Sequence, residues 1–375
     1  MAIELSNLTF TNRADIVPAS GEEGILNTGI ANTLAGNDII LGTKQTSIDS
    51  PNLLVSTSLF NSGTLNTADG NDLITGTISG IEDSPNYYNH YAIYNIGSID
   101  TGNGNDKITG DGNDKITGSA VYGIVNDFTI ATGNGNDIIS GTGSGGAAGL
   151  YTRGTINSGG GNDIIIGTNT NGSGYGIFNG FGSPPDQVAS STIDTGDGND
   201  IIMGIAAFGI FNIGIINTGN GADSIICDAS SNNGTGYGFY NRGIINTGDG
   251  NDIITEVSGH SILNSGTINT GDGDDSIIVE GGFFEYPDGS GSGSVFLGNG
   301  KDYLKGFGGG NFNGGNGKDK LELTSGSYTV GRSGTAVNFT KGSTVMNTSE
   351  FEILIAGNTI YNFASLTNGQ IITVA

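Results

Sequence analysis

Hydrophobic and polar residues alternate in short runs that recur along most of the chain. Ile-rich runs such as GTIN, GIIN and NDIIMG are separated by turns rich in Gly and Asn. β-Branched residues between such turns favour strands, and no 3.6-residue apolar period persists, so the pattern argues against helices. The sequence therefore predicts an all-β protein made of short strands and tight turns.

The turns belong to an internal repeat. TGNGNDIISG at 132–141 has relatives at 67–76, 101–110, 158–167, 195–204, 218–227, 247–256 and 270–279. An Asn precedes the repeated Asp by 11 residues, as from Asn61 to Asp72, whereas the distance from Asp to the next Asn varies from 12 to 23 residues. This combination is expected of solenoid rungs whose insertions loop out. We therefore predict a right-handed parallel β-helix or β-roll with a C-terminal β-rich cap.

Composition narrows the functional classes. The 375 residues include 70 Gly, 37 acidic and 12 basic residues, for a formal charge of −25. Such acidity argues against nucleic-acid binding, which needs Lys and Arg, and no apolar run is long enough for a membrane span. Cys227 is the single cysteine, so no internal disulfide is expected. The Gly residues mark repeat turns, which weakens the alternative that the chain is disordered.

Stacking in register would place the repeated Asp residues in one column. Neighbouring carboxylates about 5 Å apart repel by roughly 0.8 kcal/mol in water and about 3 kcal/mol at an effective dielectric of 20. Residues 45–300 contain 27 acids and four bases, so the chain lacks its own counter-charge. Ca²⁺ would resolve the conflict, because it accepts carboxylate and backbone carbonyl oxygens. The alternative is a metal-free turn in which each Asp caps its own backbone.

The turn G-x-G-N-D-x-I resembles the calcium-binding nonapeptide of the repeats-in-toxin (RTX, hemolysin-type) family, G-G-x-G-x-D-x-U-x. GGNGKDKLE at 314–322 matches it fully, and LGNGKDYLK at 297–305 matches it except at the first Gly. In that family the Asp carboxylate and turn carbonyls bind Ca²⁺ between coils. The resemblance implies ligands at Asp72, Asp106, Asp114, Asp137, Asp163, Asp200, Asp223, Asp252, Asp275, Asp302 and Asp319, with the carbonyls of Gly135, Gly198, Gly250, Gly300 and Gly317.

The family alternates nonapeptides on both sides of an 18-residue coil, whereas this chain has one such turn per rung. The predicted organisation is an N-terminal cap (1–24), a β-helix of rungs of about 23–37 residues (25–296), RTX-type β-roll turns (297–322), and a C-terminal cap and secretion module (323–375). That module resembles the end of RTX exoproteins, which carries a type I secretion signal. The first twenty residues lack the features of a Sec signal peptide. The resemblance therefore implies a bacterial protein, extracellular or on the cell surface.

Two further columns carry recurrent side chains. Aromatic residues before each Asn, such as Tyr175 and Phe178, predict a stack inside or against the solenoid, with a sugar-binding strip as the alternative. The Asn residues themselves predict a ladder whose amides satisfy backbone groups at a corner.

No catalytic constellation stands out from the repeat, so we expect a non-enzymatic calcium-binding solenoid with a structural, adhesive or matrix role. Its expected partners are calcium ions, with glycans or other cell-surface components as candidates. Two alternatives stay open: a carbohydrate-active β-helix enzyme (a polysaccharide lyase, epimerase or hydrolase) and a metal-free solenoid that associates end to end into fibres.

Overall fold

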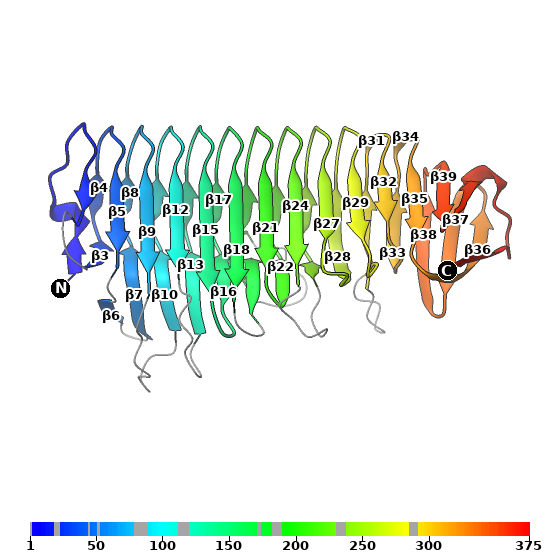
Figure 1. The fold of residues 1–375 in the computed structure, drawn as a ribbon, viewed down its shortest axis with the longest axis horizontal. Coiled ribbons are helices and arrows are strands. Elements are labelled where there is room, and N and C mark those ends of the chain that lie inside the picture. Colours follow the sequence, from blue (N-terminus) through cyan, green and yellow to red (C-terminus); the bar gives the residue numbers. More distant parts are fainter. Residues whose placement is uncertain are drawn as a thin grey trace.

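The chain winds into a rod of stacked rungs. The computed structural model describes residues 2–18, 23–43, 46–50, 53–78, 89–111, 120–170, 174–181, 190–229, 238–284 and 292–375. Within them, strands of successive rungs pair in parallel and in register along the rod, and a small group of antiparallel strands covers the C-terminal end (Figure 1). The predicted all-β parallel solenoid with a C-terminal β-rich cap is confirmed.

A typical rung contains three strands. The first ends at the Asn corner, the second is a tripeptide such as Thr-Ile-Asn, and the acidic turn T-G-x-G-N-D leads to the third. The first strands are β1 (Ala2–Glu4), β3 (Gly24–Asn27), β7 (Leu53–Asn61), β10 (Asn89–Asn95), β13 (Ala120–Asn126), β16 (Ala148–Thr152), β19 (Tyr175–Asn179), β22 (Phe208–Asn212), β25 (Phe239–Asn241) and the first half of β28 (Ile262–Asn269).

The second strands continue the same sheet after the Asn corner. They are β4 (Ile30–Asn32), β8 (Thr64–Asn66), β11 (Ser98–Asp100), β14 (Thr129–Ala131), β17 (Thr155–Asn157), β20 (Thr192–Asp194), β23 (Ile215–Asn217), β26 (Ile244–Asn246), the second half of β28, β30 (Ser292–Phe296) and β33 (Gly310–Asn313).

The third strands form a separate sheet. They are β2 (Ile16–Val17), β5 (Ile39–Gly42), β9 (Leu73–Thr77), β12 (Lys107–Asp111), β15 (Ile138–Gly143), β18 (Ile164–Asn169), β21 (Ile201–Ile205), β24 (Ser224–Asp228), β27 (Ile253–Glu256), β29 (Ser276–Val279), β32 (Tyr303–Lys305), β35 (Lys320–Leu323) and β39 (Ile353–Ala356), which pairs with β40 (Thr359–Asn362).

The core is a narrow column of aliphatic side chains. Each middle rung contributes one residue from each strand, as with Ile177, Ile193 and Ile202, and all three are fully buried. Alternation along a strand points the next residue outward. Burying each such side chain contributes about 1.5–3 kcal/mol, and only stacking onto neighbouring rungs buries it. The repeat is therefore stable as an array and not as a single rung.

The Asn corner is held by a side-chain ladder. The Nδ2 group of Asn95 donates to Oδ1 of Asn126 at 2.7 Å and to the carbonyl of Thr129 at 2.8 Å. The same bond joins Asn27 to Asn61 and Asn212 to Asn241. The predicted Asn ladder is thus present, and it satisfies a backbone carbonyl at the corner as expected.

Antiparallel strands close the C-terminal end. β36 (Gly326–Ser333) pairs with β37 (Ala336–Lys341) and β41 (Ile371–Val374), and β37 pairs with β38 (Thr344–Ser349). Since β38 and β39 also pair in parallel with the last rung, they cover edges that would otherwise be open to another chain.

Three short strands stand apart from the rung pattern. β31 (Asn299–Gly300) pairs with β34 (Asn316–Gly317), and β6 (Thr46–Ser50) lies antiparallel to β7. The helical segments of the described chain, Leu5–Asn7 and Phe363–Ser365, are single 3₁₀ turns, and no helix there is of a length and apolarity to cross a bilayer.

Candidate metal centre

The acidic turn brings the backbones of successive rungs into close contact. Gly196 and Gly198 of one turn have φ angles of 86° and 151°, in the region that side chains disfavour. A Cβ at Gly198 would lie 1.6 Å from the carbonyl oxygen of Gly161 in the preceding rung. Glycine is therefore required here by both conformation and packing, and the carbonyl of one rung points at the backbone of the next.

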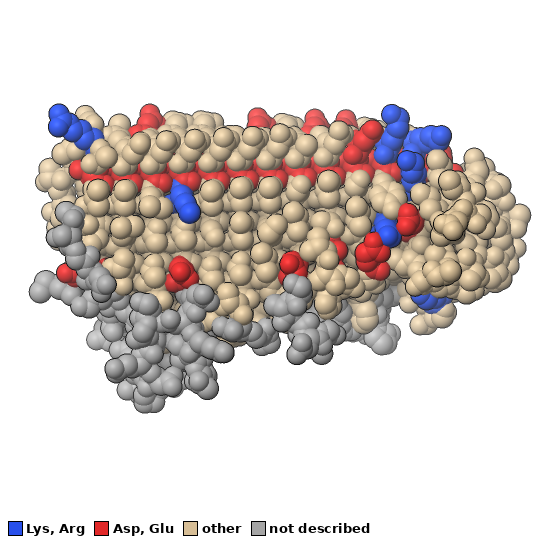
Figure 2. All heavy atoms as spheres, in the orientation of Figure 1, with Lys and Arg blue, Asp and Glu red and all other residues tan. Residues whose placement is uncertain are grey.

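The repeated Asp residues line up at the end of this turn. Each backbone N–H donates to Oδ1 of the Asp one rung later, as from Asp163 to Asp200 at 2.7 Å and from Asp200 to Asp223 at 2.8 Å. Acidic residues form a continuous band along the rod (Figure 2). The members of this acidic column are Asp38, Asp72, Asp106, Asp137, Asp163, Asp200, Asp223, Asp252, Asp275, Asp302 and Asp319.

The column carboxylates are buried, and in all but Asp38 only one of the two oxygens makes a well-formed hydrogen bond. Every member is at most 2 % exposed. Oδ1 accepts the bond from the neighbouring rung, whereas Oδ2 lacks a well-formed hydrogen bond in the ten members from Asp72 to Asp319. In eight of them a Thr or Ser hydroxyl at the start of the turn, such as Thr195 beside Asp200, nevertheless lies close enough to lower the pKa of the carboxyl. A buried acceptor without a partner is unfavourable, and more so when it is charged. The carboxylate thus caps the amide of an adjacent rung, and not its own backbone as the metal-free alternative assumed.

Burial raises the pKa of these groups. It brings the pKa of Asp200 and Asp302 to about 7, while the hydrogen bond from the preceding backbone amide, and for Asp200 also one from the Thr195 hydroxyl, acts in the opposite direction. The pKa is raised to about 6 in Asp72, Asp106, Asp137, Asp223, Asp275 and Asp319. Desolvation is the largest cause in every case. Repulsion between neighbouring carboxylates raises the pKa less than burial does.

No base of the described chain compensates this charge. Its ion pairs join Arg153 to Asp127, and Lys305 to Glu280 and Glu322, all outside the acidic column. Basic residues on the face shown in Figure 2 gather mainly near the C-terminal end. At neutral pH the column therefore consists largely of buried negative charges without a counter-ion from the protein.

The donor atoms of the turn suit a hard cation. Ca²⁺ takes 6–8 oxygen ligands and readily uses backbone carbonyls. The carbonyls of Gly135, Gly198 and Gly250 accept no hydrogen bond from the described residues, and each points at a glycine of the next rung, as that of Gly198 does at Gly221. The described residues contain no group of three or more His, Cys, Asp or Glu side chains placed to hold a metal. A cation here would depend mainly on carbonyls and on oxygens of successive rungs, a set unlike the His and Cys ligands of zinc.

The structure brings together nearly all of the residues predicted from the repeat. Asp114 lies outside the described residues. Of the predicted carbonyl ligands, that of Gly300 already accepts the Lys318 amide at 3.2 Å. One column member, Asp38, was missed although it was recognisable from its 11-residue distance to Asn27. Glu352, which lies beyond the end of the column and accepts the Asp319 amide at 2.8 Å, had no sequence signal.

Comparisons with known proteins give little further information. No protein-family model matches the chain, and no curated protein matches it. One similar solved structure is described as a hyperactive, Ca²⁺-dependent, β-helical antifreeze protein from an Antarctic bacterium. The two share 17% sequence identity over 94% of each chain, with a TM-score of 0.39. The metal site is therefore inferred from the geometry of this chain alone.

Proposed function

We propose that this chain is a calcium-binding β-solenoid whose acidic column holds Ca²⁺ between successive rungs. The observation that carries the proposal is the file of ten buried Asp carboxylates whose Oδ2 atoms lack a well-formed hydrogen bond and whose charge no base of the described chain neutralises. A divalent cation would provide the missing electrostatic partner for charges that the protein does not neutralise. The regular register of the rungs would repeat the same site along the rod.

Calcium binding would be coupled to folding. The column exists only when rungs stack, so Ca²⁺ would bind the folded chain far more tightly than the unfolded one and stabilise it by mass action. We propose export by a type I pathway, in keeping with the resemblance to RTX exoproteins, followed by folding where Ca²⁺ is abundant. A structural, adhesive or matrix role fits a rigid rod better than catalysis, because the column acids are equivalent members of one file.

Calcium titration of the purified full chain tests the proposal. We expect calorimetric uptake of Ca²⁺, a gain of β-sheet circular dichroism or of thermal midpoint, and reversal by EDTA. Mg²⁺ should act more weakly, because it demands a strict octahedron and dehydrates reluctantly. No calcium uptake, together with circular dichroism and a thermal midpoint unchanged by EDTA, would rule the proposal out.

A matched pair of substitutions locates the site. Asp252→Asn removes a buried column carboxylate, whereas Asp249→Asn removes an exposed carboxylate from the same turn. Both remove one negative charge, so a nonspecific effect of charge would appear in both variants. We expect Asp252→Asn to weaken calcium uptake and Asp249→Asn to leave it nearly unchanged. Equal losses in the two variants would show that Ca²⁺ does not bind the acidic column.

A further inference from the structure

A file of aromatic rings runs along the outside of the first strands. We call it the aromatic array, and its neighbouring ring centroids lie 4.4–6.1 Å apart. The array is separate from the aliphatic core, because the alternation of each strand points Ile177 inward and Phe178 outward. Its members are Phe60, Tyr91, Tyr94, Tyr122, Tyr151, Tyr175, Phe178, Phe208, Phe211 and Tyr240.

The array is hollowed near its middle. A cavity of about 140 Å³ lies between the rings of Tyr122, Tyr151, Tyr175 and Phe178, beside the backbone of 146–148. The hollow is open to solvent on one side and is close in volume to the cavity of about 150 Å³ that accepts a benzene molecule, so one sugar ring would be only partly enclosed by it. All four side chains are half-buried, so their rings remain partly accessible from solvent.

Polar groups surround this hollow. The hydroxyls of Tyr122, Tyr151 and Tyr175 make no hydrogen bond with the described residues, and burial raises the pKa of each, so they remain protonated and able to donate. The Arg153 guanidinium lies 5.5 Å from the centroid of the Tyr151 ring. Aromatic walls with a few polar groups are typical of sites that orient a small ring.

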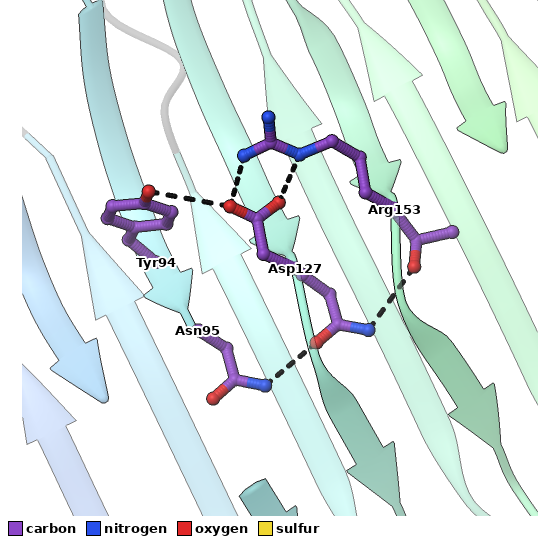
Figure 3. A network of polar contacts seen from close by, with 6 residues as sticks. Tyr94, Asn95, Asp127 and Arg153 are labelled. Carbon is purple, nitrogen blue, oxygen red and sulfur yellow. Dashed lines mark hydrogen bonds and ion pairs between the residues drawn. The ribbon is translucent and has the colours of Figure 1, made fainter. Parts of the chain in front are cut away.

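The cation at this site is already neutralised. Arg153 binds Asp127 through Nε and Nη2, and the Tyr94 hydroxyl donates to the same carboxylate at 3.4 Å (Figure 3). The network fixes the guanidinium beside the rings and leaves no free positive charge to attract an anion. Together with the formal charge of −25, it disfavours acidic polysaccharides and nucleic acids.

We propose that the aromatic array binds a neutral, extended glycan chain, with one pyranose ring seated in the hollow at Tyr151. The C–H face of a pyranose ring is attracted to the electron-rich face of an aromatic ring, and the sugar hydroxyls match the unused Tyr hydroxyls at the hollow. Elsewhere in the array the rings cover one another's faces, as Phe178, Phe211 and Tyr240 do, so the other sugar units would meet ring edges. The array extends over the rungs of β7 to β25, roughly 30 Å at a rung spacing of ~4.8 Å.

Calorimetry on the calcium-loaded full chain tests this binding, with cellohexaose and hydroxyethyl cellulose as probes and polygalacturonate as the anionic comparison. We expect saturable binding of the neutral glucans and no measurable binding of polygalacturonate. Tyr151→Ala should weaken neutral-glucan binding about tenfold or more, and Tyr151→Phe should retain most of it, because the ring that lines the hollow remains. Phe296→Ala is the matched control, since its exposed ring lies outside the array, and it should bind normally.

Circular dichroism and calcium uptake of each variant separate loss of binding from loss of folding. The inference is overturned if folded wild-type protein binds neither neutral glucan, if it prefers polygalacturonate, or if Tyr151→Ala folds and binds normally. It is also overturned if sedimentation shows that the array joins two copies of the chain, seen as a dimer that Tyr151→Ala dissociates. Calcium uptake would be unaffected by any of these results, so the two proposals can fail independently.

Discussion

Replacing Asp200 by Asn separates the two roles of a column carboxylate. The Asn side chain has nearly the same shape and retains an oxygen that can accept the Asp163 N–H, which now bonds Asp200 at 2.7 Å. The substitution removes the buried charge and any affinity that this charge provides for a cation. We therefore expect opposite effects on stability: Asp200→Asn should stabilise the chain in EDTA and destabilise it, relative to wild type, in saturating Ca²⁺.

The size of the first effect follows from the pKa. Burial raises the pKa of Asp200 from 3.8 to about 7. One pKa unit corresponds to about 1.4 kcal/mol, so the charged form opposes folding by at most about 4 kcal/mol at pH 8. Water near the turn screens part of this penalty, and a gain of about 2–4 kcal/mol is expected for the Asn variant.

The pH dependence has a definite sign. A carboxyl group whose pKa is raised on folding binds protons more tightly in the folded state, so its unfavourable contribution is absent below pH 3.8 and complete above about pH 7. Metal-free wild-type protein should therefore lose stability as the pH rises from 4 to 8. The advantage of Asp200→Asn should disappear at pH 4, where both side chains are neutral.

Urea unfolding followed by circular dichroism measures these differences at pH 4 and pH 8, in EDTA and in Ca²⁺. Midpoints are the safer readout, because repeat arrays can unfold in more than one step. Asp197→Asn is the control, since it removes an exposed carboxylate from the same turn. The reasoning is refuted if Asp200→Asn is no more stable than wild type in EDTA at pH 8, or if calcium stabilises both proteins equally.

Three further substitutions test the packing of the rungs by thermal or urea unfolding in Ca²⁺. Gly135→Ala would place a Cβ 1.4 Å from a carbonyl oxygen, at a residue whose φ is 150°, and should destabilise the folded chain by about 3 kcal/mol or more. Its control is Gly146→Ala, whose Cβ meets open space and which should be nearly neutral. Asn212→Ala removes a member of the Asn ladder and should lower stability by about 1–3 kcal/mol, unlike the exposed Asn358→Ala. Ile202→Ala should lower stability by about 2–5 kcal/mol because it leaves a cavity in the core. Wild-type stability in any of the first-named variants would contradict the assigned packing.

The rung and the register were predictable because the repeat has constant internal spacing. The 11 residues from Asn61 to Asp72 span one corner, one short strand and one turn, so equal spacing forces equivalent residues into columns. The recurrence of Ile indicated residues that stacking would bury, whereas their division among three strands of each rung came from the structure. A sequence with period-2 strands and regular turns thus specified the architecture closely.

Side-chain partners at the corners were not predictable in the same way. A corner residue leaves the regular strand, so spacing alone does not say that the Asp72 carboxylate accepts the amide of Asp38 and not its own. The aromatic array shows the same limit, since its position inside or outside the solenoid was left open. The neighbouring Ile177 settles it, because one residue of each adjacent pair must face the core.

The two corners of a rung provide an internal comparison for the role of the charge. At the Asn corner, a neutral side chain bridges rungs, and both its oxygen and its NH₂ group are used, as in Asn126 between Asn95 and Thr155. At the acidic turn, Asp137 also bridges rungs through Oδ1, a buried charge is added, and Oδ2 lacks a well-formed hydrogen bond although the Thr132 hydroxyl lies close enough to lower the pKa. Asn could accept the same backbone amide without that electrostatic penalty. The repeated occurrence of Asp at this turn, in a chain that places Asn at the other corner, is expected if the second carboxylate oxygen meets a group that an amide NH₂ cannot meet, either the Thr hydroxyl of the turn or a cation. The hydroxyl needs only an acceptor, whereas coordination of a hard cation also uses the negative charge, and Asp200→Asn compared in EDTA and in Ca²⁺ separates the two.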